Sequence, residues 1–186
     1  MMIRIPVLAY VVIWAGMIVW LLPFFLTGWS KKRPEKRDPR WRWGVALEIA
    51  GYLTIGLVHF EPIRIESWRI ALSAGFFALA CLLSWTSTRA LGSYLRFEAA
   101  IDADHQLVRS GPYRVVRHPI YASMLCVFFA IAAIVATPVS IVPGLALFIA
   151  GTEVRVRVEE RLLAGRFGAE FEEYRRTTAA YVPLLL

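Results

Sequence analysis

The chain has few charged residues for its length, and few cysteines and histidines. Only 19% of its 186 residues are charged, whereas globular domains average about one quarter. Both cysteines, Cys81 and Cys126, lie inside apolar runs, so we expect buried, unreactive thiols and no disulfide framework. Three histidines and two separate cysteines form no metal-ligand pattern. We therefore expect no bound metal.

Two further absences exclude soluble classes of protein. No glycine-rich strand–turn–helix unit occurs, which excludes a soluble Rossmann-type methyltransferase. No recognition helix or platform of alternating aromatic and basic residues is present, so nucleic acid is not an expected partner. What remains is a chain with 58% hydrophobic and 13% aromatic residues. This composition indicates a membrane protein.

The apolar runs predict an all-α integral membrane protein with about five transmembrane helices, the last two forming a hairpin. A crossing needs about 20 apolar residues. The first run lacks a small-residue cleavage motif, so we expect a retained helix and not a signal peptide. Thr137-Pro138 and Pro143-Gly144 interrupt the last long run and predict a reversal there. The expected spans are residues 3–26, 43–60, 70–90, 120–136 and 141–155.

The basic residues predict the orientation in the membrane. Lys and Arg gather in residues 31–42, 89–117 and 155–176, which hold seven, five and six of them. Such clusters face the cytosol, so we expect a multi-pass protein with its N-terminus outside and its C-terminus inside, in the inner membrane if the source is bacterial. We expect the first cluster to be a solvated turn that faces lipid headgroups. The remaining two then lie on the same cytosolic side.

Two polar segments on that side carry the candidate chemistry. The first, HQLVRSGPYRVVRHPIY at residues 105–121, has a predicted helix start at His118-Pro119, whose free N–H groups suit a carboxylate ligand. A turn at Gly111-Pro112 returns the chain toward that point. The second is VRVRVEERLLAGRFGAEFEEY, residues 154–174.

Helical spacing organises the second segment. Arg155 and Glu159 are four residues apart and therefore share one helix face. Phe167-Gly168 predicts the end of that helix, because glycine favours a helix C-terminus. A short amphipathic helix is expected over residues 169–176.

The residues alone leave open that some of these side chains have only structural roles. Glu48, inside the second span, is either a structural partner or a site residue, because an intramembrane carboxylate needs protein or a polar cavity around it. Arg109, Arg114 and Arg117 can bind a ligand or merely touch anionic headgroups. The second segment can equally be a helix covered with ordinary salt bridges.

The motifs LVxSGPYxxxRHPxY and RxxxEExxLxxxFGxEFxxY, in this order, resemble the isoprenylcysteine carboxyl methyltransferase family. That family belongs to a wider group of membrane methyltransferases that includes phospholipid N-methyltransferases. The resemblance covers residues 90–186 and implies two parts. Residues 1–90 would form three transmembrane helices with a basic cytosolic loop at 28–42, and residues 91–186 would form the methyltransferase core.

The resemblance implies S-adenosylmethionine as cofactor and assigns roles by position. Arg155 and Glu159 would be catalytic, with Arg155 binding the methyl acceptor. The cytosolic loops and C-terminal helices would build the cofactor site. The implied cofactor-binding residues are Glu98, His105, Gln106, Leu107, Val108, Tyr113, His118, Pro119, Ile120, Tyr121, Glu159 and Glu160.

The expected acceptor is lipophilic, enters from the bilayer and carries a carboxylate, as an isoprenylcysteine or an isoprenoid acid does. An ionised carboxylate needs no general base, whereas an amine acceptor would need one, and His118 is the candidate. Three alternatives stay open: a phospholipid N-methyltransferase, an NADPH-dependent membrane reductase of related fold, and a non-enzymatic scaffold.

Overall fold

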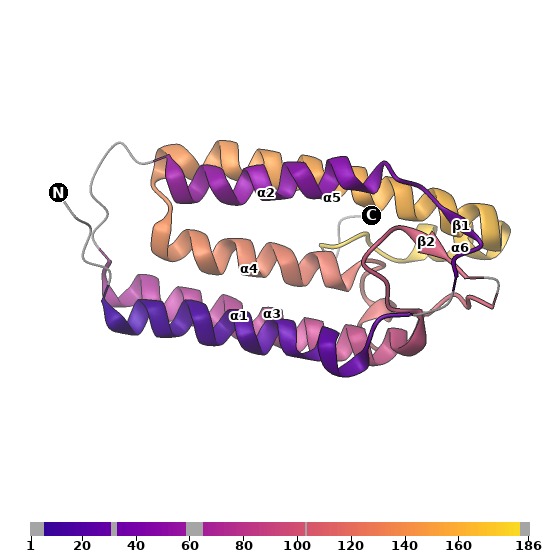
Figure 1. Cartoon of the computed structure of the whole chain (residues 1–186), viewed down its shortest axis with the longest axis horizontal. Coiled ribbons are helices and arrows are strands. Elements are labelled where there is room, and N and C mark those ends of the chain that lie inside the picture. The colour runs from indigo at the N-terminus through magenta and orange to yellow at the C-terminus, as the bar shows by residue number, and fades with distance from the viewer. Residues whose placement is uncertain (1–5, 31–32, 59–64, 103, 183–186) are drawn as a thin grey trace.

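Five long helices run side by side in three layers (Figure 1). The computed structural model describes residues 6–30, 33–58, 65–102 and 104–182. One outer layer contains α1 and α3, the other contains α2 and α5, and α4 lies between them. The helices are α1 Val7–Thr27, α2 Trp41–Leu57, α3 Ser67–Leu91, α4 Pro119–Val135 and α5 Pro138–Phe167.

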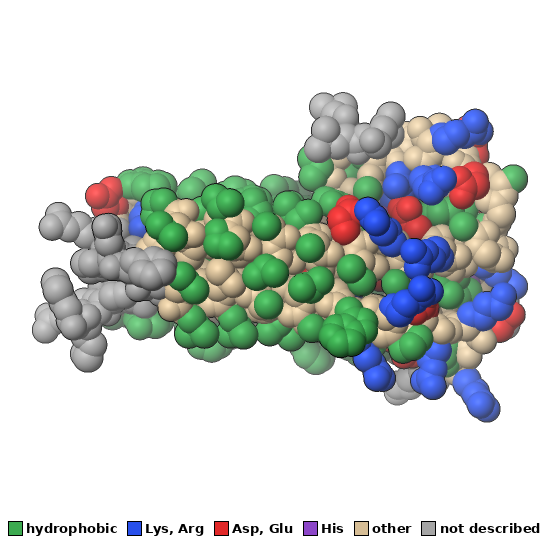
Figure 2. Space-filling model, turned by 90° about the horizontal axis from the view of Figure 1, so that it is seen from above, with side chains coloured by type: hydrophobic (Ala, Val, Ile, Leu, Met, Phe, Trp, Pro, Cys, Tyr) green, Lys and Arg blue, Asp and Glu red, His purple; other side chains and the backbone are tan. Residues whose placement is uncertain are grey.

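Short elements gather at one end of this bundle, which we call the polar end. They are β1 Lys36–Arg37, η1 Gly92–Tyr94, β2 Ala100–Ile101, η2 Gly111–Arg114 and α6 Ala169–Thr177. Figure 2 shows hydrophobic side chains along the length of the helices and most of the visible Arg, Lys, Asp and Glu side chains at the polar end. The protein is therefore an all-α membrane protein, as predicted.

The helices differ in how well they match a bilayer. Within the described part of the chain, three segments are long and apolar enough to cross a membrane: Val7–Thr27, Ser67–Tyr94 and Pro138–Phe167. The remaining two, α2 and α4, have 17 residues each. That length is at the lower limit of the about 17–25 residues that a crossing takes.

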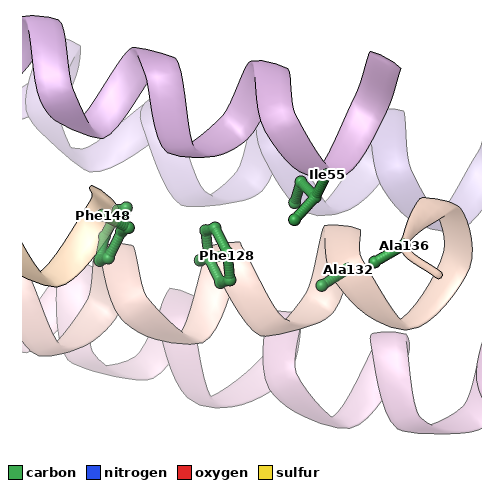
Figure 3. Close-up of a cluster of buried hydrophobic side chains, with 5 residues drawn as sticks. All are labelled: Ile55, Phe128, Ala132, Ala136 and Phe148. Carbon is green, nitrogen blue, oxygen red and sulfur yellow. The ribbon is translucent and has the colours of Figure 1, made fainter. Parts of the chain in front are cut away.

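The core lies between α4 and the two outer layers. Figure 3 shows Phe128, Ala132 and Ala136 facing Ile55 and Phe148, and the rings of Phe128 and Phe148 lie 5.1 Å apart. On the other side of α4, Val127 and Ala130 pack against Phe77 and Ala80 of α3. Burying such apolar side chains between layers holds α4 in the centre of the molecule.

The reversal between α4 and α5 is tighter than predicted. Thr137 caps α5: its Oγ1 accepts a hydrogen bond from Ser140 N at 3.3 Å, and Ser140 Oγ accepts one from Thr137 N at 3.0 Å. The predicted break at Thr137-Pro138 is confirmed, but the one at Pro143-Gly144 is wrong. Pro143 lies inside α5, where it removes only one hydrogen bond near the start of the helix. The returning helix therefore begins at residue 138 and not at 141.

Glycines allow α2 and α5 to touch through their backbones. A Cβ atom on Gly151 would lie 2.5 Å from the carbonyl oxygen of Gly44, and one on Gly44 would lie 2.4 Å from Cγ of Arg155. Real side chains cannot approach so closely. These two positions of α2 and α5 therefore need glycine, and the contact brings polar side chains of the two helices together.

The basic linker between α1 and α2 is more ordered than the predicted solvated turn. Lys36 pairs with Ile101, and Arg37 with Ala100, in an antiparallel two-stranded sheet. Glu35 N donates to Ile101 O at 2.9 Å, which extends the pairing. The Lys36 and Arg37 side chains are exposed, so the charges still face solvent while the backbone binds β2.

Candidate functional site

A cavity with a volume of about 160 Å³ lies at the polar end. Its walls come from the chain between α3 and α4, from the start of α4, from the last third of α5 and from α6. The structure thus brings the two polar segments of the sequence together around one space. The predicted site residues that line it are Glu98, His105, Leu107, Val108, Tyr113, His118, Ile120, Tyr121, Arg155 and Glu159.

Three predicted residues are not among those lining the cavity. Gln106 is exposed, and Pro119 is buried at the first position of α4. Glu160 lies behind the wall, where it accepts a hydrogen bond from Arg117 Nε at 2.9 Å and lies 3.2 Å from His118 Nε2. Its contacts are therefore with residues that line the cavity.

Several lining residues were not predicted. Leu162 and Leu163 follow Glu159 by three and four residues on α5, so helical spacing alone would have placed them on the same face. The others depend on the folding of loops and α6 and carry no such signal. They are Leu91, Tyr94, Arg96, Ala99, Ala100, Ile101, Arg117, Phe171 and Tyr174.

Glu159 stands at the centre of a partly buried polar network. Tyr121 donates its hydroxyl to Glu159 Oε1, and His118 Nδ1 lies 3.6 Å from Glu159 Oε2. The His118 ring therefore lies between two carboxylates, those of Glu159 and Glu160. Arg117 adds a positive charge at 2.9 Å from Glu160. The network fixes Glu159 toward the cavity that it lines.

The ionisation of His118 follows from this arrangement. Burial by itself lowers the pKa of a histidine, but the hydrogen bonds and charges of Glu159 and Glu160 outweigh it and raise the pKa of His118 above its usual 6.5. An imidazolium between two carboxylates is thus favoured. Such a histidine is a poor general base, because it already holds its proton.

The C-terminal segment holds the start of α4 in place. Backbone N–H groups of Arg117 and His118 donate to the carbonyl oxygens of Ala179 and Ala180, both at 2.8 Å. Arg117 Nη1 also donates to the carbonyl oxygens of Arg175, at 3.0 Å, and of Thr178. These contacts show that Arg117 binds the backbone of its own chain and does more than touch headgroups.

α6 closes the same side. Tyr174 Oη donates to the carbonyl oxygen of Tyr113 at 2.6 Å, and the guanidinium of Arg109 lies 5.4 Å from the centre of the Tyr174 ring. Arg109 also pairs with Glu170 at 2.9 Å. Arg114 is exposed. Gly168, with φ of 53°, ends α5 at the predicted position and starts α6.

Arg155 and Glu48 form a buried ion pair between α5 and α2. Arg155 Nη1 lies 2.9 Å from Glu48 Oε2, and the two residues are 7% and 3% exposed. Thr152 Oγ1 donates to Glu48 Oε1 at 3.2 Å. Arg155 Nε is buried and has no hydrogen-bond partner among the described residues. Arg155 lines the cavity, whereas Glu48 does not.

His105 carries the second unpaired donor or acceptor of the cavity wall. Its Nδ1 is buried and has no hydrogen-bond partner in the described part of the chain. The ring packs against Tyr94, with ring centres 4.7 Å apart. Burial lowers the pKa of His105 more than the nearby Asp102 raises it, so the neutral imidazole is favoured. An unpaired buried nitrogen on a residue that lines a cavity indicates a place for a polar ligand group.

Glu98 lies on the rim near a cluster of opposite charges. Its carboxylate is 3.8 Å from Arg96, which also pairs with Asp102. Ser30 Oγ donates to Asp102 Oδ2 at 3.1 Å and so ties the end of α1 to this loop. Within residues 6–30, 33–58, 65–102 and 104–182, no group of three His, Cys, Asp or Glu side chains could hold a metal ion.

Comparison with known proteins identifies relatives that match just under half of the chain. One relative is the cobalt-zinc-cadmium resistance protein CzcN of Cupriavidus metallidurans, 39% identical over 83 residues, which are 44% of this chain and 38% of the relative. Another is the protein-S-isoprenylcysteine O-methyltransferase of Saccharomyces cerevisiae, 30% identical over 84 residues, 45% of this chain and 35% of the relative. Both alignments thus span little more than a third of the relative. Residues 68–170, more than half of the chain, match the phospholipid methyltransferase family as a whole. The cavity, its motifs and this match agree, and the chain belongs to the phospholipid methyltransferase family.

Proposed function

We propose that the protein is an integral membrane methyltransferase that uses S-adenosylmethionine to methylate a lipophilic acceptor, and that the acceptor group is a carboxylate. The observation that carries the proposal is the cavity at the polar end, which residues of both polar motifs line. Residues 68–170, which match the phospholipid methyltransferase family, include most of these lining residues.

The cavity wall fits the proposed cofactor. S-adenosylmethionine, when bound, supplies a methyl group activated by a sulfonium cation. Glu159 places a carboxylate on the wall, and a cation is favoured beside it. The unpaired Nδ1 of His105 accepts or donates one hydrogen bond to a polar ligand group. Apolar and aromatic residues such as Tyr94 and Leu107 cover the rest and exclude water.

Arg155 suits the acceptor. Its Nε is buried and unpaired, and a planar guanidinium binds carboxylates with directed hydrogen bonds. A carboxylate acceptor and a sulfonium donor lose charge together as the methyl group moves. A site that excludes water therefore favours that transfer, provided that binding offsets the cost of removing water from both. The main task of the residues is alignment.

The surroundings of His118 count against an amine acceptor. An ammonium group must lose a proton before it can be methylated, and a general base has to accept that proton. The carboxylates of Glu159 and Glu160 raise the pKa of His118, which favours the protonated ring and makes it a poor acceptor for that proton.

The positively charged polar end supports a cytosolic location of the site. By the positive-inside rule, the end that carries β1 and the basic linker faces the cytosol, where S-adenosylmethionine is made available. An apolar acceptor would reach the cavity from the bilayer, between helices whose outer surfaces are hydrophobic.

The test supplies methyl-labelled S-adenosylmethionine to the purified protein with two acceptors in parallel. One is N-acetyl-S-farnesylcysteine, and the other is phosphatidylethanolamine in vesicles. We expect label in the first, released by mild alkali as a methyl ester should be. Alkali-stable label in phosphatidylethanolamine would overturn the carboxylate assignment in favour of N-methylation. Binding of NADPH without binding of S-adenosylhomocysteine would overturn the methyltransferase proposal.

A further inference from the structure

We propose that Glu48 is a positioning residue of the acceptor site: its carboxylate on α2 orients the Arg155 guanidinium so that Nε faces the cavity. The inference rests on the proposed function, and it adds a residue from the N-terminal half of the chain. Glu48 lies outside residues 68–170, which match the family, and outside the motifs that carry the resemblance.

The contact between the two side chains is short and shielded. Glu48 Oε2 accepts a hydrogen bond from Arg155 Nη1 at 2.9 Å, and Glu48 Oε1 accepts one from Thr152 Oγ1 at 3.2 Å. Both carboxylate oxygens are therefore engaged with α5. Two hydrogen bonds to one helix fix the carboxylate, and the carboxylate in turn fixes one edge of the guanidinium.

Aromatic rings restrict the guanidinium further. Its central carbon lies 4.7 Å from the centre of the Tyr121 ring and 5.8 Å from that of Phe97. With Nη1 bound to Glu48, Nε is left buried without a hydrogen-bond partner in the described residues. A buried donor without a partner is costly, so such a donor on a cavity wall indicates that a ligand supplies the acceptor atom.

The charge of Glu48 also matters for the reaction. A buried arginine that loses its partner charge is costly to keep in place, so without Glu48 the guanidinium would leave the position that acceptor binding needs. Glu48 balances that charge, so that Arg155 directs the acceptor mainly through hydrogen-bond geometry. The pair as a whole is close to neutral.

The glycine contact explains why a residue of α2 can do this. Gly44 and Gly151 bring the backbones of α2 and α5 together, and a Cβ on Gly151 would lie 2.8 Å from the backbone nitrogen of Glu48. Larger residues would push α2 away from α5 and separate Glu48 from Arg155. The ion pair between Glu48 and Arg155 thus depends on the close approach of α2 and α5.

The test compares Glu48→Gln and Glu48→Ala with Glu153→Gln as a matched control. Glu153 lies on α5 and pairs with Arg157 on the surface at 3.3 Å. For each protein, KM and kcat are measured with N-acetyl-S-farnesylcysteine, and the Kd of S-adenosylhomocysteine is measured by titration. We expect Glu48→Gln to raise the acceptor KM about tenfold, Glu48→Ala to raise it further, and both to keep the Kd within about twofold.

The outcome separates positioning from structural support. If Glu48 acts through Arg155, adding Glu48→Gln to an Arg155→Gln protein does not raise the acceptor KM further. If the two residues act independently, the effects of the two substitutions on KM multiply. An acceptor KM unchanged by Glu48→Gln overturns the inference. Equal loss of acceptor and S-adenosylhomocysteine binding overturns it as well, because that result indicates a general structural defect.

Failure of the proposed function gives a different result. Binding of N-acetyl-S-farnesylcysteine to the wild-type complex with S-adenosylhomocysteine is measured first. No binding by the wild type overturns the carboxylate assignment and the role of Glu48 together. Binding by the wild type that Glu48→Gln and Glu48→Ala leave unchanged overturns only the role of Glu48.

Discussion

Among single residues, Glu159 differs from an ordinary surface glutamate in the number of its contacts with side chains of the cavity wall. Tyr121 and His118 both direct hydrogen-bonding atoms to its carboxylate. Glu170, by contrast, forms an exposed pair with Arg109. A surface pair of that kind contributes little to stability. The two glutamates therefore offer a matched comparison.

We predict that Glu159→Gln weakens S-adenosylhomocysteine binding by about tenfold to a hundredfold, because charge-assisted hydrogen bonds contribute about 1.5–3 kcal/mol. Titration calorimetry of the detergent-solubilised protein measures the Kd. Glu170→Gln should leave the Kd unchanged within about twofold. Equal weakening by both variants would contradict a specific role for Glu159.

The two histidines of the cavity wall predict opposite pH dependences of stability. The pKa of His118 is raised in the folded protein, so its contribution is present below the ordinary value of 6.5 and is lost as pH rises through the folded pKa. The pKa of His105 is lowered, so its protonation destabilises the fold as pH falls below 6.5.

Melting temperatures of the wild type and of His118→Gln and His105→Gln, measured between about pH 5.5 and pH 9, test this. The melting temperature of His118→Gln should fall furthest below that of the wild type at low pH, and the difference should shrink as pH rises. The melting temperature of His105→Gln should instead rise relative to that of the wild type as pH falls. Parallel curves for all three proteins would show that neither histidine changes its pKa on folding.

At the scale of elements, the pairing of β1 with β2 connects the basic linker to the cavity. Ala99, Ala100 and Ile101 line the cavity, and Glu35 N donates to the carbonyl oxygen of Ile101. The linker therefore supports one wall from outside. Loss of that support should weaken the binding of a ligand in the cavity.

Glu35→Pro removes the backbone N–H of this contact, because proline lacks one. We predict a several-fold, up to about tenfold, weaker Kd for S-adenosylhomocysteine, corresponding to one hydrogen bond. Glu35→Gln keeps the N–H and serves as control for the side chain, whose carboxylate is 3.8 Å from Arg166. If Glu35→Gln weakens binding as much as Glu35→Pro does, the side chain and not the strand pairing matters.

The contact of α2 with α5 predicts a steric effect at one glycine of α5 and none at another. Gly151→Ala would place its Cβ 2.5 Å from the Gly44 carbonyl oxygen, whereas a Cβ on Gly165 meets nothing within 4 Å. We expect Gly151→Ala to lower the free energy of unfolding by about 1–3 kcal/mol, as overpacking does. Gly165→Ala should leave it equal or raise it by up to about 1 kcal/mol. Denaturant unfolding in mixed micelles measures both, and similar values for the two variants would contradict the close approach.

At the scale of the whole molecule, the orientation in the membrane is open to a direct test. Arg37 lies at the polar end, and Val139 lies at the opposite end, just after the turn between α4 and α5; both are exposed. Cysteines introduced at these positions, with Cys81 and Cys126 replaced by alanine, report on the two sides.

In intact cells, a membrane-impermeant maleimide should label the Val139→Cys protein and not the Arg37→Cys protein. After permeabilisation, both should react. The reason is the positive-inside rule, which places the basic polar end in the cytosol. Labelling of the Arg37→Cys protein from outside would reverse the orientation and place the cavity away from the cytosolic cofactor.

Much of this molecule follows from local features of the chain. The start of α4 at Pro119, the end of α5 at Phe167 and the reversal at Thr137-Pro138 were predictable, because proline, glycine and capping residues act on the nearest turn. The extra break expected at Pro143-Gly144 failed for the complementary reason. Packing of Gly144 against Ile55 of α2 supports the helix there, and a single sequence does not reveal that neighbour.

The site divides in the same way. Order and helical spacing in the sequence were enough to place Arg155 and Glu159 on one helix face and to predict that the two polar segments lie at one end of the molecule. Only the tertiary structure decided that Glu48 meets Arg155, that β1 supports β2 and that His118 lies between two carboxylates. These contacts join residues far apart in the chain. They depend on how closely helices approach, which backbone contacts such as that of Gly44 with Gly151 set and periodicity does not encode.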